Sequence, residues 1–205
     1  MTDIYTISMI ITIAVFTLTT HITPGPTNII LLSSVLNFGY KRSLPFMIGN
    51  IISYPIMMIF TGFGFGLLLT QHPTMMSILK VFGMAYLCFM AWKIFKDTHT
   101  YDTKKAVEKE PFTFWQSLIY PWLNPKAWIV YSSTISVFIT SSENSFIQMS
   151  IIVFFIFISM VITVYAWAFG GVILKKFMKN EKFIKRINQT MAILLVASII
   201  PILIN

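Results

Sequence analysis

Long uncharged runs of apolar residues constrain this chain more than any other feature of its sequence. Leu44 to Leu69 contains no charged residue, and about 20 apolar residues are enough for a helix to cross a bilayer. Charged residues make up 11% of the chain, whereas a soluble domain has about 25%. The sequence therefore predicts an all-α membrane protein with six transmembrane helices. The six apolar runs are Ile4–Phe38, Leu44–Leu69, Met75–Phe95, Phe112–Thr140, Phe146–Leu174 and Ile187–Ile204.

The basic residues orient these runs in the membrane. Of the 15 lysines and arginines, Lys93 lies at the end of the third run, and all others except Lys80 and Lys126 follow the first, third and fifth runs. Short basic loops are retained in the cytoplasm. We therefore expect cytoplasmic basic loops and both termini outside. The formal net charge of +8 does not indicate nucleic-acid binding, because the basic residues flank apolar runs without interleaved aromatic residues. The opening MTDIYTIS lacks the basic region of a signal peptide, so the first run is expected to stay in the protein.

The order of the runs predicts two related halves. Three spans per half is an odd number, so related halves must have opposite orientations in the membrane. We expect a single transmembrane domain over residues 1–205, with repeat one at 1–95, a cytoplasmic linker at 96–111 and repeat two at 112–205. The first span of each half contains a proline break, TPGP in one and LNPKAW in the other. The predicted fold is thus a 3+3 inverted repeat whose first helix is broken at proline in each half.

The first run is too long for one upright helix. At 1.5 Å per residue it would extend about 50 Å, against a hydrocarbon core of about 30 Å. TPGP should interrupt it, because proline removes an amide donor and clashes with the preceding turn. The freed main-chain groups are costly in hydrocarbon and are tolerated only inside protein or beside a water-filled cavity. Such helix ends suit a zwitterion, with amides facing a carboxylate and carbonyls facing an ammonium group. The alternative is a proline kink that only helps helix packing.

The predicted substrate-binding residues are those of the two breaks and the polar side chains at similar depth: Pro24, Gly25, Pro26, Thr27, Asn28, Asn50, Asn124, Pro125 and Lys126. A lysine near the bilayer midplane costs about 2.5 to 3.5 kcal/mol or more, so Lys126 should face the protein interior. It can bind a substrate carboxylate, carry a proton, or pair with carbonyls freed by Pro125. Each asparagine can also serve only to hold helices together. His21 can shuttle protons, although a lone histidine beside a kink is more often a satisfied hydrogen-bond donor.

The acidic residues exclude several classes of membrane protein. All seven lie outside the runs or at their ends: Asp3, Asp97, Asp102, Glu108, Glu110, Glu143 and Glu181. This distribution argues against an aspartyl protease, a carboxylate proton relay and a cation pump with an acidic site. The sequence has neither H-E-x-x-H nor G-x-S-x-G, so we expect no enzyme activity, no metal site and no cofactor. Cys88 is the only cysteine and is expected to be a small buried core residue.

Three stretches resemble the LysE/RhtB group of bacterial amino-acid exporters: TPGPTNIILLSSVLNFGYKRSLPFMIGN, LKVFGMAYLCFMAWK and FWQSLIYPWLNPKAW. With the six-span layout, the resemblance covers nearly the whole chain. The run from TPGPTN through FG to LP, and the FW before LNPK, look closest to the cysteine and O-acetylserine exporter branch. The resemblance implies alternating-access export of a small neutral amino acid or derivative, of the cysteine/O-acetylserine or homoserine/threonine type. It also implies a bacterial plasma membrane and a proton gradient as the driving force.

Three other functions are disfavoured but open. A thiol–disulfide electron carrier needs a pair of cysteines, and a divalent-metal exporter is typically lined by midplane carboxylates or a histidine cluster. A non-transporting membrane scaffold would have a dry interior. The expected partners are an amino-acid substrate and the lipid bilayer, and a homodimer is an open alternative.

Overall fold

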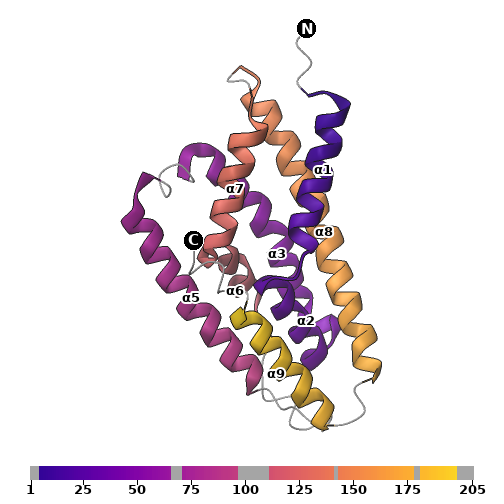
Figure 1. Cartoon of the computed structure of the whole chain (residues 1–205). Helices are drawn as coiled ribbons and strands as arrows, with labels where there is room; N and C mark the ends of the chain where they lie inside the picture. Colours follow the sequence, from indigo (N-terminus) through magenta and orange to yellow (C-terminus); the bar gives the residue numbers. More distant parts are fainter. Residues whose placement is uncertain (1–4, 66–70, 97–110, 141–142, 178–180, 198–205) are drawn as a thin grey trace.

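The computed structural model describes residues 5–65, 71–96, 111–140, 143–177 and 181–197, and every regular element among them is a helix (Figure 1). The all-α prediction is therefore confirmed for the described residues. The elements are α1 (Ile7–Ile22), α2 (Pro26–Phe38), α3 (Tyr40–Phe60), the π-helical η1 (Thr61–Phe65), α5 (Pro73–Phe95), α6 (Phe114–Ile119), the 3₁₀-helical η2 (Tyr120–Leu123), α7 (Pro125–Phe138), α8 (Ser145–Phe177) and α9 (Glu181–Ala197).

Both proline motifs interrupt a helix, as predicted. α1 and α2 form a pair bent by 55° at the TPGP break. Thr23 and Gly25 each precede a proline and have extended backbones, with ψ angles of 138° and 175°, because proline disfavours the α region in the residue before it. Asn124 is extended in the same way before Pro125, where η2 ends and α7 begins. Local chain chemistry therefore accounts for both breaks.

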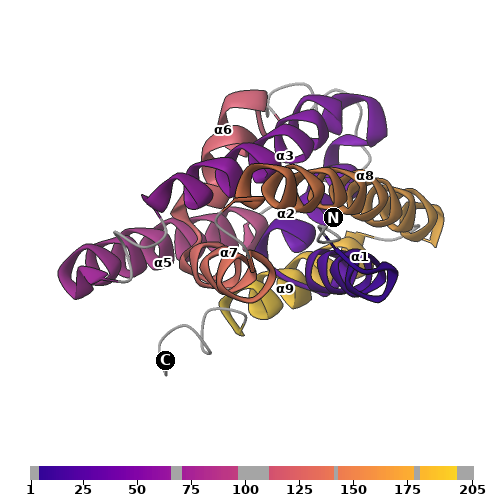
Figure 2. The same cartoon turned by 90° about the horizontal axis from the view of Figure 1, so that it is seen from above.

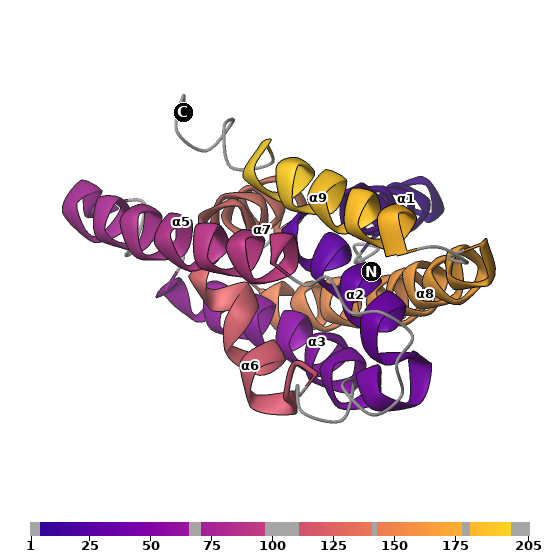
Figure 3. The ribbon, with the colours of Figure 1, turned by 90° about the horizontal axis from the view of Figure 1, so that it is seen from below.

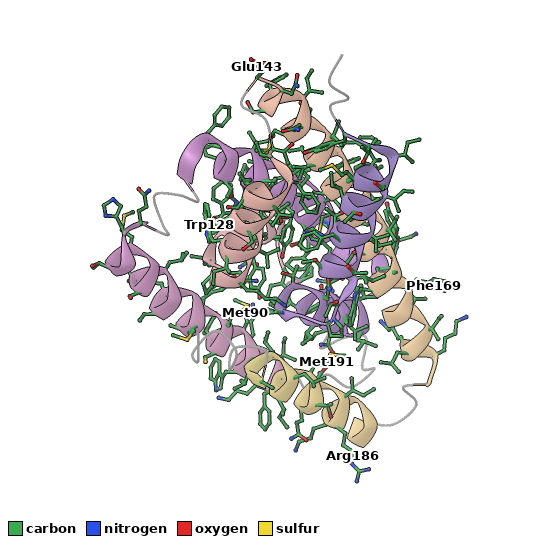
Figure 4. The ribbon with its side chains drawn as sticks, turned by 45° about the horizontal axis from the view of Figure 1, so that its top comes forward. Met90, Trp128, Glu143, Phe169, Arg186 and Met191 are labelled. Carbon is green, nitrogen blue, oxygen red and sulfur yellow. The ribbon has the colours of Figure 1, made fainter. Side chains whose placement is uncertain are left out.

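Helix packing places the first break inside the bundle. α8 packs against α1, α2 and α3, while α3 also packs against α6, and α5 packs against α9. The end views show α2 near the centre (Figures 2 and 3), and most of its residues are buried. The outer faces are apolar, as expected for contact with lipid: Phe169 of α8 is 66% exposed and points away from the bundle (Figure 4).

Not every predicted span is long enough among the described residues. Three helices are long and apolar enough to cross a membrane, namely Tyr40–Gly64, Ser77–Phe95 and Ser145–Lys176, and the bent α1–α2 pair makes a fourth if it counts as one span. α7 has 14 residues and α9 has 17, so the fourth and sixth predicted runs fall short. The last residues of the sixth run, from 198 on, and residues 97–110 of the predicted linker lie outside the described residues.

The described basic segments gather at one end of the bundle. That end carries the turn between α2 and α3, the last turns of α5 and α8, and the start of α9 (Figure 1). Arg186 lies at this end and Glu143 lies at the opposite one (Figure 4). The arrangement agrees with basic loops that share one side of the membrane.

The prediction that Cys88 is a buried core residue is wrong. Its side chain is exposed on α5, where the neighbouring Phe89 and Trp92 are 51% and 54% exposed. The physical reason is that α5 packs against the bundle along one face only, so its other face is left for lipid.

Two glycines allow the second broken segment to approach the first half of the chain closely. A Cβ atom on Gly83 of α5 would collide with the main-chain oxygen of Leu123. A Cβ atom on Gly49 of α3 would collide with the side chain of Ser117 and the main-chain oxygen of Phe114. The missing side chains therefore bring α6 and η2 to backbone contact with α3 and α5.

Gly83→Ala is expected to lower the free energy of unfolding by about 1–3 kcal/mol, the usual cost of overpacking, because the obstructing atom belongs to the main chain. Thermal unfolding of the purified protein in detergent measures the change. Gly170→Ala in α8 is the matched control, since nothing lies within 4 Å of a Cβ atom there and both glycines are inside helices. Equal midpoints for the two variants would contradict the close approach.

Candidate functional site

A cavity of about 70 Å³ lies where the two breaks meet. Gly25 and Pro26 from the first break and Asn124 and Lys126 from the second line the same space. The rest of the wall comes from α1, α2, α3, α7 and α8, together with Thr23 of the first break. Segments separated by about 100 residues in the sequence thus form one site in the middle of the bundle.

Six of the nine predicted site residues line this cavity: Gly25, Pro26, Thr27, Asn28, Asn124 and Lys126. The other three do not. Pro24 is exposed and does not line the cavity. Pro125 is buried beside Gly83 of α5 at the start of α7. Asn50 lies in α3 with no exposed surface, and its Nδ2 donates a hydrogen bond to the Phe46 oxygen at 2.9 Å.

The carbonyl end of α1 leaves one main-chain acceptor without its intrahelical donor. The intrahelical donor for the Thr20 carbonyl would be the amide of residue 24, but that residue is a proline and has no N–H group. Thr20 itself lines the cavity. Because the carbonyl end of a helix carries partial negative charge, this side of the cavity favours a cation.

The following carbonyls of α1 are bound by side chains. Asn28 donates from Nδ2 to the oxygens of His21 and Thr23, at 2.7 and 3.0 Å. Trp167 of α8 donates from Nε1 to the oxygen of Ile22 at 3.1 Å. Asn28 therefore acts first as a clamp on the helix end, which is the structural role that a buried asparagine can also fill.

The amide end of α2 is open, whereas that of α7 is closed. Gly25 precedes α2 and has no side chain to cap it, so the amides of Thr27 and Asn28 lack an intrahelical acceptor. The next amide, that of Ile29, donates to the Gly25 oxygen at 3.0 Å. In α7 the Asn124 side-chain oxygen accepts from the Lys126 amide at 3.1 Å. The Lys126 side chain lines the cavity yet is exposed, so it stands at the cavity mouth rather than enclosed in the interior. The open amides and this ammonium group favour an anion.

Three aromatic rings form one wall of the cavity. The centroid of the His21 ring lies 5.5 Å from that of Tyr54 and 6.1 Å from that of Tyr131. His21 Nδ1 donates to the Thr17 oxygen at 2.6 Å, and Nε2 lies 3.0 Å from the Tyr131 hydroxyl. The Tyr54 hydroxyl lies 2.7 Å from Oγ1 of Thr27. The sequence-based interpretation of His21 as a satisfied histidine agrees with these bonds, but it missed the two tyrosines.

A signal for the tyrosines is present in the sequence. A tyrosine hydroxyl within an apolar run must find a polar partner when it is buried, and Tyr54 and Tyr131 both lie inside such runs. Tyrosines at membrane interfaces occur in similar runs, however, so the sequence does not separate the two cases. The apolar part of the wall, Ala127, Val130 and Met160, has no such signal.

The cavity thus presents a carbonyl end and an amide end of one interrupted helix, together with a lysine and hydroxyl groups. This arrangement can bind a small molecule that carries both an ammonium group and a carboxylate. Among the described residues, no group of three or more histidine, cysteine, aspartate or glutamate side chains could hold a metal ion.

Curated relatives align with part of the chain. The Cysteine/O-acetylserine efflux proteins of Escherichia coli (strain K12) and Shigella flexneri serotype 5b (strain 8401) are each 32% identical over 126 residues, which is 60% of this chain and 62% of the relative. The alignment therefore spans less than two thirds of the length of these relatives. No solved structure matches the chain.

The sequence model of the LysE type translocator family matches residues 18–200. This range contains both helix breaks and all the cavity-lining residues that the structure describes. The chain therefore belongs to the LysE type translocator family.

Proposed function

We propose that this protein is a secondary transporter that exports a small neutral amino acid across a bacterial plasma membrane. The observation that carries the proposal is the cavity lined by the carbonyl end of α1, the uncapped start of α2 and Lys126. The curated relatives, which are named for cysteine and O-acetylserine efflux, support the same class of substrate.

The proposed substrate has a defined orientation in the cavity. Its carboxylate accepts hydrogen bonds from the first amides of α2 and faces the ammonium group of Lys126, because both carry positive charge. Its ammonium group faces the Thr20 carbonyl and the hydroxyl of Tyr131. The side chain is left to the apolar wall of Val130 and Met160.

The size of the cavity supports a small amino acid. At about 70 Å³, the cavity holds more than one water molecule. Alanine, serine and cysteine are small amino acids that suit a cavity of this size. O-acetylserine is larger than these three.

Pairwise helix contacts support the proposed 3+3 inverted repeat of residues 1–95 and 112–205. α3 packs on α8 and α5 packs on α9, so each helix meets its proposed counterpart, as expected if a twofold axis passes between them. α1 packs on α8 in the way that α6 packs on α3. In this proposal the chain has six spans, with both termini outside and with the basic loops and the 96–111 linker in the cytoplasm.

Rocking of one repeat against the other would then open the cavity to each side in turn, with the proton gradient as the driving force. One chain supplies the described wall of the cavity, so the mechanism needs no second copy, and a homodimer stays a prediction.

Cells that overexpress the protein should export labelled alanine, serine or cysteine faster than cells with an empty vector. Lys126→Gln should raise the KM about tenfold or more, because hydrogen bonds to charged groups contribute about 1.5–3 kcal/mol. Lys176→Gln, at the exposed end of α8, is the control for loss of one lysine. An unchanged KM in Lys126→Gln would refute the carboxylate site, and wild-type protein that exports none of the three would refute the function.

Gly25 offers a second test of the carboxylate site. A serine at this N-cap position would accept from the open amides of α2 and compete with the substrate, and a Cβ atom there has room, with the Thr23 oxygen at 3.8 Å. Gly25→Ser should therefore be more stable than Gly25→Ala by about 1 kcal/mol and should unfold at a higher temperature. Gly25→Ser should nevertheless have the higher KM of the two variants. If Gly25→Ser transports with the lower KM, the amides of α2 do not bind the carboxylate.

A further inference from the structure

His21 takes part in a hydrogen-bond chain that can hold an extra proton without moving any heavy atom. Its Nδ1 donates to the Thr17 oxygen at 2.6 Å, because a carbonyl can only accept. Its Nε2 faces the Tyr131 hydroxyl at 3.0 Å, and a hydroxyl can either donate or accept. A neutral imidazole accepts a hydrogen bond at Nε2 from the Tyr131 hydroxyl. An imidazolium instead donates a hydrogen bond from Nε2 to the Tyr131 oxygen.

The two states present different groups to the cavity. When His21 is neutral, the Tyr131 hydroxyl points its hydrogen at Nε2 and keeps its lone pairs for an outside donor. When His21 is protonated, one lone pair of the Tyr131 oxygen accepts from Nε2, and the Tyr131 hydrogen turns toward the cavity. The imidazolium then places a positive charge behind the aromatic wall of the cavity. Both residues line the cavity, so the change acts directly on whatever is bound there.

The charged and titratable groups around His21 do not offset this charge. α3 contributes Tyr54, and α7 contributes Tyr131 and the cationic Lys126. α2 and α8 contribute uncharged residues, such as Thr27, Asn28 and Met160. No carboxylate is among the described residues that line the cavity. The two charges in question are the proton on His21 and the ammonium group of a bound substrate. Two like unit charges about 6 Å apart weaken each other's binding about 100-fold at an effective dielectric constant of about 20.

We propose that His21 is the coupling residue of this transporter, at which a proton and the ammonium group of the substrate exclude each other through Tyr131. The inference rests on the proposed export function and adds the residue and the mechanism of coupling. Substrate binding from the cytoplasm expels the proton from Nε2, and proton binding from the outside expels the substrate. Because the site holds one or the other, no crossing carries both, and the exchange is obligatory when the site crosses only in an occupied state.

Calorimetric titration of the purified protein with L-serine and with reduced L-cysteine tests the exclusion without any need for transport. The affinity of the wild-type protein for either amino acid should fall as the pH is lowered, by up to about tenfold per pH unit. Binding of the amino acid should release protons to the buffer. His21→Gln keeps polar groups but cannot be protonated, so its affinity should not change with pH and it should release no proton. Tyr131→Phe should bind about tenfold more weakly, because the relaying hydroxyl is lost.

Transport in proteoliposomes gives the second readout. With the membrane potential clamped at zero and a pH difference of one unit, one-for-one exchange sustains a substrate ratio of about tenfold. The wild-type protein and Lys176→Gln should reach this ratio, whereas His21→Gln should stop at a ratio of one. The ratio is the readout rather than the rate, because His21 lines the cavity and its loss also slows transport.

The outcomes separate this inference from the function on which it rests. A pH-dependent affinity that persists in His21→Gln, or that disappears in Lys126→Gln instead, would overturn the assignment of coupling to His21 and leave export standing. A wild-type affinity that does not vary with pH would do the same. Wild-type protein that neither binds nor exports serine or cysteine would overturn the proposed function and this inference together.

Discussion

Main-chain hydrogen bonding at the two interrupted helices is the constraint on which the rest of this structure depends. Hydrocarbon offers no partner for a free amide or carbonyl, so each group at a break must find one within the protein or beside water. Asn28 and Trp167 supply donors to the end of α1, and Asn124 supplies an acceptor to the start of α7. The groups left over include the Thr20 carbonyl and the amides of Thr27 and Asn28, and these three residues line the cavity. These open groups are the ones that a bound amino acid would satisfy.

Polar pairs between helices position α2, which carries one side of the cavity. At the cavity end, Thr27 is bonded to Tyr54 of α3 at 2.7 Å. At the other end, Asn188 of α9 donates to Asn37 at 3.2 Å. Such pairs are directional and at least partly buried, so they fix the register of α2 against its neighbours more tightly than apolar contacts alone. The position of the open amides relative to Lys126 and the tyrosines follows from this register.

The sequence predicts the helical class and both breaks because proline acts locally, on its own amide and on the residue before it. It also predicts that Asn28, Asn124 and Lys126 meet, because matching breaks in two halves imply a shared site. It cannot separate Asn50 from these residues, since depth in the membrane does not say which way a helix face turns. The exposure of Cys88 and the aromatic wall of His21, Tyr54 and Tyr131 depend on helix rotation and packing, which an almost uniformly apolar run does not encode.

Water access to the cavity tests the central claim most directly. In a Cys88→Ser background, Ala127→Cys places a thiol on the cavity wall and Ala168→Cys places one in the packed core of α8. A small charged thiol reagent should modify the residue at 127, more slowly when serine is present, and should leave the one at 168 unmodified. If neither position reacts, the interior is dry, and the ends of the broken helices do not form a hydrated amino-acid site.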